Sequence, residues 1–136
     1  MPAARAARRN GAPPFEERFL EAFSNADGPS GWEAPVRDLV VSAVRDRVDS
    51  LEVDAMGSLV ARLSPSGARS RRRLPHVMLC AHMDEVGFMV TAVEKDGRLR
   101  FRKVGDIDPR ILLGQVFRVG MNGARGVVGV LPAHLL

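Results

Sequence analysis

The residues best suited to chemistry lie together at positions 81–87, in the sequence AHMDEVG. His82 can offer a neutral imidazole nitrogen to a divalent metal ion. Asp84 can accept a hydrogen bond from the other ring nitrogen, which would fix the tautomer of the ring and raise its basicity as a ligand. Glu85 could assist at this site or simply be solvated. The H-x-D spacing is a weak signal by itself, because a zinc site needs at least three protein ligands.

The other candidate ligands and nucleophiles are weaker. His76 lies about six residues before His82, roughly 20 Å away along an extended strand, so the two cannot share a metal ion. His134 is available as a metal ligand in principle, but the P-A-H-L-L sequence around it favours a structural role. Cys80 lies inside an apolar run without an evident basic partner, so we expect it to be a small core residue rather than a nucleophile.

The element that must position His82 is the run HVMLCA at positions 76–81. A near-continuous apolar run of this kind is typical of a strand buried on both faces of a mixed α/β sheet. Sites in α/β folds usually lie at the carboxyl ends of such strands. Upstream, apolar spacing predicts amphipathic helices over 15–23 and from near Pro35 to about Val48. Ser30 and Glu33 have the S-x-x-E spacing of a capping box for the second helix.

Turn residues predict three hairpins, around Met56-Gly57, Asp96-Gly97 and Asn122-Gly123. Residues 1–12 lack apolar periodicity and are predicted to be a disordered tail. About the first 85 residues are typical of an α/β unit and about the last 50 of an all-β unit, so we expect two structural units.

Charge and composition exclude several classes of protein. The 136 residues carry a net charge of +4, from 20 basic and 16 acidic side chains. Seven of the basic residues are arginines in two short segments. The rest of the chain has 13 basic and 16 acidic residues and is therefore mildly acidic, which argues against nucleic acid as a partner. Those arginines are at positions 5, 8, 9, 69, 71, 72 and 73. No apolar run approaches the roughly 18 residues of a membrane span, and the single cysteine suits a reducing, cytoplasmic location.

Five segments in one order resemble the glutamyl aminopeptidase or tetrahedral aminopeptidase family of dinuclear metallopeptidases, whose members are sometimes misnamed cellulases or endoglucanases. They are SG-x-E at 30–33, VDAMG at 53–57, VMLCAHMDEVGFMV at 77–90, LRFRKVGDIDPRILLGQ at 99–115 and PAHLL at 132–136. The resemblance implies that His82 is the first metal-binding histidine, that Asp84 orients it and supports catalysis, and that a complete site holds two divalent ions, zinc or cobalt. It also implies that His134 is not a ligand.

The resemblance further implies a fold, namely an α/β, mixed-sheet aminopeptidase domain interrupted by a small β-barrel-like domain that contributes to oligomer assembly. On this basis residues 13–86 are the N-terminal part of the peptidase domain and residues 87–136 begin the inserted unit. Ser58 stands where the family usually has asparagine. The bridging aspartate, the general-base glutamate and the remaining ligands lie further along the family's chain.

We therefore expect the N-terminal portion of an enzyme that removes N-terminal residues from peptides. Its expected partners are peptide substrates, further copies joined through the β unit, or the missing C-terminal portion. By itself this portion is expected to bind metal weakly and to be inactive. The alternative is a non-catalytic truncated paralogue that acts as an oligomerisation or interaction module.

Overall fold

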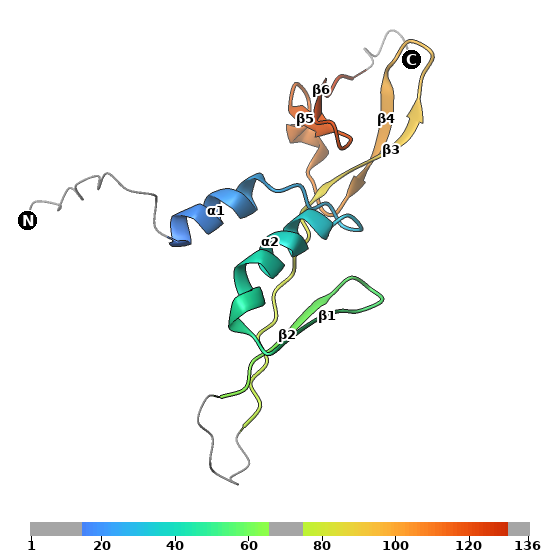
Figure 1. The fold of residues 1–136 in the computed structure, drawn as a ribbon. Coiled ribbons are helices and arrows are strands. Elements are labelled where there is room, and N and C mark those ends of the chain that lie inside the picture. The colour runs from blue at the N-terminus through green and yellow to red at the C-terminus, as the bar shows by residue number, and fades with distance from the viewer. Residues whose placement is uncertain (1–14, 66–74, 131–136) are drawn as a thin grey trace, which may run out of the picture. The chain divides into compact units, whose positions relative to one another are not determined.

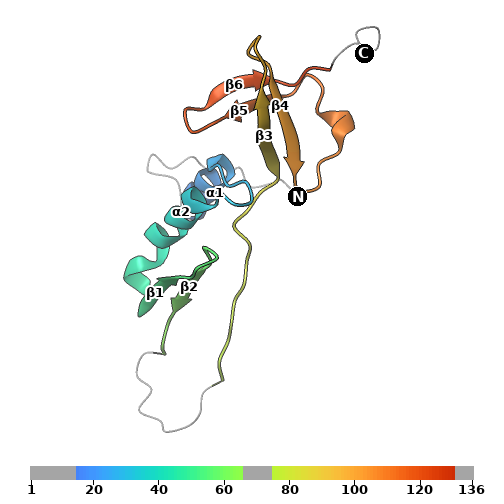
Figure 2. The same cartoon turned by 90° about the vertical axis from the view of Figure 1, so that its right-hand side faces the viewer.

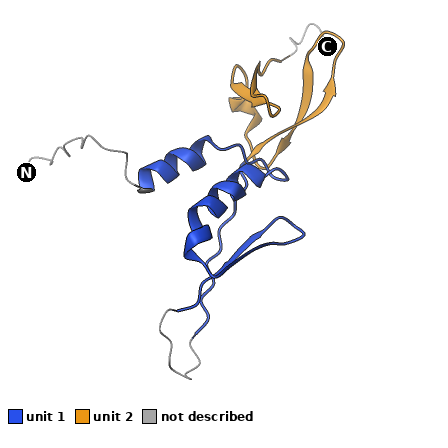
Figure 3. Cartoon of the chain, viewed as in Figure 1, with its two compact units in different colours: residues 1–85 blue, residues 86–136 orange. Residues whose placement is uncertain are grey.

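The computed structural model describes residues 15–65 and 75–130, and the chain divides into two compact units, residues 1–85 and 86–136 (Figure 3). Within the described residues, the first unit contains two α-helices and one hairpin, and the second contains two hairpins (Figure 1). The protein is thus a mixed α/β chain with small antiparallel sheets. Among its described helices, none has the length and apolar character that crossing a bilayer requires.

The described part of the first unit contains α1 (Phe15–Asn25) and α2 (Ala34–Val44), and the short 3-10 helix η1 (Arg45–Arg47) directly follows α2. Both predicted helices are confirmed, although the second changes to 3-10 geometry in its last turn. Pro35 lies in the first turn of α2, where its missing N–H breaks no hydrogen bond.

The predicted capping box at the start of α2 is wrong. Glu33 is the N-cap residue and makes no side-chain cap. Its carboxylate instead accepts a hydrogen bond from the backbone N–H of Gly31 at 2.6 Å. Ser30 precedes this N-cap residue in the chain, and its hydroxyl donates instead to a residue 54 positions further along.

The first hairpin joins β1 (Ser50–Val53) to β2 (Leu59–Arg62) as an antiparallel pair, as predicted. Its turn is held by Asp54, whose Oδ1 accepts hydrogen bonds from the backbone N–H groups of Met56 at 2.9 Å and Ser58 at 2.8 Å. Gly57 has a φ of +90°, which favours glycine at this position. The hydrogen bond from Ser58 is the largest cause that lowers the pKa of Asp54 below 3.8.

Replacing Asp54 by alanine is expected to lower the thermal midpoint of the chain at neutral pH, because the turn loses the acceptor of two backbone N–H groups. The folded pKa lies below the unfolded value, so this stabilisation is complete above about pH 4 and is lost as the pH falls through the folded pKa. The difference between the thermal midpoints of Asp54→Ala and wild type should therefore become smaller as the pH is lowered from 7 to 2.5. Asp46→Ala, in η1, is the control. A difference in midpoint that does not change across this pH range would contradict the assignment.

Residues 76–81 form no strand, and the prediction of a strand buried on both faces is wrong for this structure. The segment follows an extended course, yellow in Figure 2, and its apolar side chains are open to solvent, with Val77 81% and Leu79 93% exposed. Cys80 is exposed as well, so its predicted place in a core is also wrong. The physical reason is pairing: a strand needs neighbours for its backbone hydrogen bonds, and none of the described strands pairs with these residues.

The second unit contains β3 (Gly87–Val93) paired with β4 (Leu99–Val104), then the 3-10 helix η2 (Pro109–Ile111), and β5 (Val116–Val119) paired with β6 (Ala124–Val127). The predicted hairpins at Asp96-Gly97 and Asn122-Gly123 are both confirmed. Only the glycine of each pair has a positive φ, +86° at Gly97 and +64° at Gly123.

Aromatic contacts join the two hairpins of the second unit. The ring of Phe88 on β3 packs edge-to-face against Phe101 on β4, with centroids 4.9 Å apart, and against Phe117 on β5 at 4.7 Å. Ile107 and Leu112, on either side of η2, are the buried apolar residues of the described chain. Closure of these strands into a barrel stays a prediction.

Candidate functional site

The loop that carries His82 is anchored to the segment between the two helices of the first unit. The backbone N–H of Glu85 donates to the carbonyl oxygen of Gly28 at 2.8 Å, and the N–H of Gly28 donates to the Glu85 carboxylate at 3.0 Å. A parallel bridge pairs Pro29 with Glu85. The role of Glu85, which the sequence left open, is in this structure to hold the loop in place.

Gly28 is required by the close approach of these two segments. It is buried, and a Cβ at this position would lie 2.7 Å from Cγ2 of Val36 and 3.3 Å from the carbonyl oxygen of Met83. Both distances are shorter than ordinary van der Waals contact. The absence of a side chain at Gly28 therefore lets the 82–85 loop approach the start of α2.

His82 and Asp84 form the predicted pair. Nδ1 of His82 lies 3.0 Å from Oδ1 of Asp84 and 3.0 Å from the backbone carbonyl oxygen of the same residue. The carbonyl and the ionised carboxylate can only accept, so Nδ1 must carry the hydrogen and Nε2 keeps its lone pair in the neutral ring. The imidazole is 86% exposed, which leaves Nε2 accessible to a metal ion.

The carboxylate of Asp84 is held on its other side by Ser30, whose Oγ donates to Oδ2 at 2.7 Å. This hydrogen bond is the largest cause that lowers the pKa of Asp84 below its usual range, and the hydrogen bond with His82 is the second. Asp84 is therefore ionised at neutral pH and suited to accept the Nδ1 hydrogen. Sequence reasoning missed Ser30 as a site residue, because its spacing to Glu33 also matched a capping box.

The loop supplies one of the several ligands that a metal site needs. Within residues 15–65 and 75–130, no three His, Cys, Asp or Glu side chains gather where they could hold a metal ion. His82, oriented by Asp84, supplies one neutral nitrogen ligand, so further ligands would have to come from outside these residues. His134 and the arginine segments at 1–12 and 69–73 lie outside the described residues.

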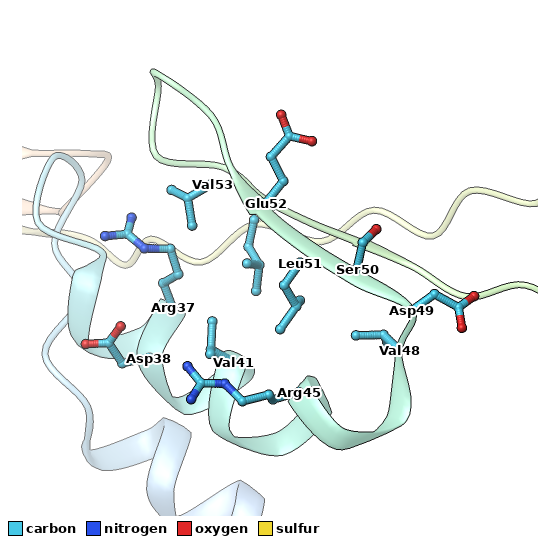
Figure 4. A pocket seen from close by; sticks show the side chains of 11 residues that line it. Arg37, Asp38, Val41, Arg45, Val48, Asp49, Ser50, Leu51, Glu52 and Val53 are labelled. Carbon is cyan, nitrogen blue, oxygen red and sulfur yellow. The ribbon is translucent and has the colours of Figure 1, made fainter.

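A separate cavity of about 480 Å³ lies between α2 and β1 in the first unit (Figure 4). Apolar side chains from the helix and the strand gather in it, including Val41 and Leu51, and charged side chains such as Arg45 line its rim. Arg37 at one end donates to the carbonyl oxygen of Gly57 at 3.0 Å, which ties the helix to the hairpin turn. None of the lining residues belongs to the 81–85 loop, so the cavity is not part of the His82 site.

Known proteins of one family are similar to most of this chain, including the loop that carries His82. The family model for M42 glutamyl aminopeptidases matches residues 57–136. The lysyl aminopeptidase of Pyrococcus furiosus is 41% identical over 120 residues, which cover 86% of this chain and 33% of the relative.

Two solved structures share both the fold and much of the sequence. One is described as an endoglucanase of Thermotoga maritima. It is 41% identical with a TM-score of 0.71, and the match covers 83% of this chain and 34% of that one. The other is the TET1 peptidase of Pyrococcus horikoshii, which can assemble into a tetrahedron or a large octahedral shell. It is 36% identical with a TM-score of 0.70, over 88% of this chain and 34% of that one. The chain thus spans about a third of the length of the relatives it matches.

Proposed function

The chain belongs to the M42 glutamyl aminopeptidase family, and we propose from this that it contributes part of the active site of a metal-dependent enzyme that removes N-terminal residues from peptides. The observation that carries the proposal is the His82–Asp84 pair, which lies within the matched residues and leaves Nε2 of the ring accessible. His82 is the metal ligand and Asp84 is the residue that orients it.

The complete site is proposed to hold two divalent ions, zinc or cobalt. A divalent ion, when bound, supplies Lewis acidity to a peptide carbonyl and lowers the pKa of a coordinated water. The part that this chain plays is to present a neutral histidine nitrogen with its tautomer already selected. Since the described residues supply a single histidine with its orienting carboxylate, the chain by itself is expected to hydrolyse little.

Residues 87–136 are proposed to begin an inserted β unit that joins further copies of the protein. The aromatic contacts of Phe88 give this unit a small core of its own. The relative from Pyrococcus horikoshii can assemble into a tetrahedron or a large octahedral shell, which supports the proposal that this unit joins copies of the protein. If the chain joins other subunits without contributing to catalysis, the alternative of a non-catalytic interaction module applies.

The deciding experiment exchanges the matched 120 residues of the lysyl aminopeptidase of Pyrococcus furiosus for those of this chain. The chimera, loaded with Zn²⁺ or Co²⁺, is expected to release p-nitroaniline from aminoacyl p-nitroanilides and to lose this activity when a chelator is added. Lysyl and glutamyl substrates should both be tried, with a soluble cellulose as the control substrate. A folded, metal-loaded chimera that hydrolyses no aminoacyl substrate would contradict the proposed function and favour the interaction module.

A further inference from the structure

Two segments far apart in the sequence meet at the Asp84 carboxylate. Residues 28–30 dock on residues 83–85 through two hydrogen bonds between Gly28 and Glu85, at 2.8 and 3.0 Å, and through the Pro29–Glu85 bridge. This docking brings Ser30 beside Asp84, where its hydroxyl donates to Oδ2 at 2.7 Å. The contact is therefore built by tertiary structure and is not a local turn.

The two oxygens of Asp84 have different partners. Oδ2 accepts from Ser30, whereas Oδ1 lies 3.0 Å from Nδ1 of His82, which is also 3.0 Å from the backbone carbonyl oxygen of Asp84. The torsion that turns a carboxylate about its Cβ–Cγ bond is broad, so a carboxylate held by one oxygen alone can rotate readily. Holding Oδ2 keeps Oδ1 aimed at the ring. Helix capping does not explain Ser30, because Glu33 is the N-cap residue of α2.

We propose that Ser30 is a positioning residue of the metal site: its hydroxyl holds the Asp84 carboxylate, which keeps His82 in the tautomer that leaves Nε2 open to a divalent cation. The proposal rests on the proposed function for the role of His82 as a ligand. The coupling from Ser30 through Asp84 to the His82 ring does not depend on that role, because the ring tautomer can be measured without any enzyme activity.

The test uses the full chain labelled with ¹⁵N-histidine at constant neutral pH and without metal. Long-range ¹H–¹⁵N spectra report which ring nitrogen of His82 carries the hydrogen. In the wild type this is expected to be Nδ1, and Ser30→Ala is expected to raise the share of the Nε2–H tautomer. Ser30→Thr and Ser30→Val form a matched isosteric pair, because they differ by the hydroxyl, so Thr should retain the wild-type tautomer distribution and Val should raise the share of the Nε2–H tautomer as Ala does, with the backbone carbonyl of Asp84 still accepting part of the Nδ1 hydrogen.

A second readout is the affinity for Co²⁺ alone, followed by calorimetry. Loss of a partner that orients a ligand typically costs about 10- to 100-fold in metal affinity, and Ser30 acts through Asp84, so the expected loss in Ser30→Val is about 10-fold. In an Asp84→Ala background the Ser30 substitutions should have no further effect on tautomer or affinity. Glu85→Gln is the control for the docking contact, since its amide oxygen can still accept from Gly28.

The outcomes separate this inference from the proposed function. An unchanged His82 tautomer in both Ser30→Ala and Ser30→Val would overturn the positioning role of Ser30, even if His82→Ala abolished Co²⁺ binding. A tautomer shift together with Co²⁺ binding that His82→Ala leaves intact would support the coupling and overturn the metal-ligand role. In separate, uniformly ¹⁵N-labelled samples, the backbone amide signals of Gly28 and Glu85 check that each variant keeps the docked loop.

Discussion

In the chimeric aminopeptidase, His82→Ala is expected to lower kcat by at least about 100-fold and to reduce the metal content of the enzyme. Removing a residue that merely orients a ligand already costs about 10- to 100-fold in metal affinity or activity, and here the ligand itself is lost. The exposed imidazole, with its hydrogen held on Nδ1 by Asp84, has no substitute among the described residues, because no second histidine or acid completes a metal cluster there. Kinetics with aminoacyl p-nitroanilides and metal analysis of the purified protein measure both effects.

The matched control is His76→Ala. His76 is a second exposed histidine at the start of the same extended segment, so its removal tests for nonspecific effects of losing an imidazole there. We expect its kcat and metal content to stay within about twofold of the parent, as is usual for a surface substitution away from a site. Equal losses in the two variants, or full activity in His82→Ala, would contradict the assignment of His82.

Phe88→Ala is expected to have the largest effect on stability. Substituting a fully buried phenylalanine by alanine costs about 3–5 kcal/mol, and each edge-to-face pair contributes about 0.5–1.5 kcal/mol beyond area burial. Phe88 is half-buried and makes two such pairs, with Phe101 and Phe117. We therefore expect a loss of about 2–4 kcal/mol in the free energy of unfolding of the second unit.

Urea titration followed by backbone amide signals of β3 to β6 measures this loss in the full chain. Met89→Ala, at the next position of β3 and 59% exposed, is the matched control and should shift the midpoint little. If both variants shift the midpoint equally, the Phe88 cluster is not the core of the second unit. Trp32, which lies in the first unit, provides a fluorescence signal for that unit in the same titration.

Local features of the chain followed from the sequence. The helices over 15–25 and 34–44 and all three hairpins agree with prediction, because apolar spacing and turn residues act over a few neighbouring positions. The family could also be predicted from the sequence, because motifs that occur in the same order can be recognised without knowing the fold. The comparisons with known proteins confirm this prediction. The predicted buried strand at 76–81 failed because burial depends on partners that residue types alone do not supply.

The sequence by itself thus determined the secondary structure near each turn, the family, and the close spacing of His82 and Asp84. These are short-range properties of the chain. Tertiary structure alone decided that Ser30 holds Asp84 rather than capping α2, and that Gly28 lets the two segments meet. The Ser30 hydroxyl donates to a carboxylate 54 positions further along the chain, so its partner is set by the docking of two distant segments and not by the spacing of nearby residues.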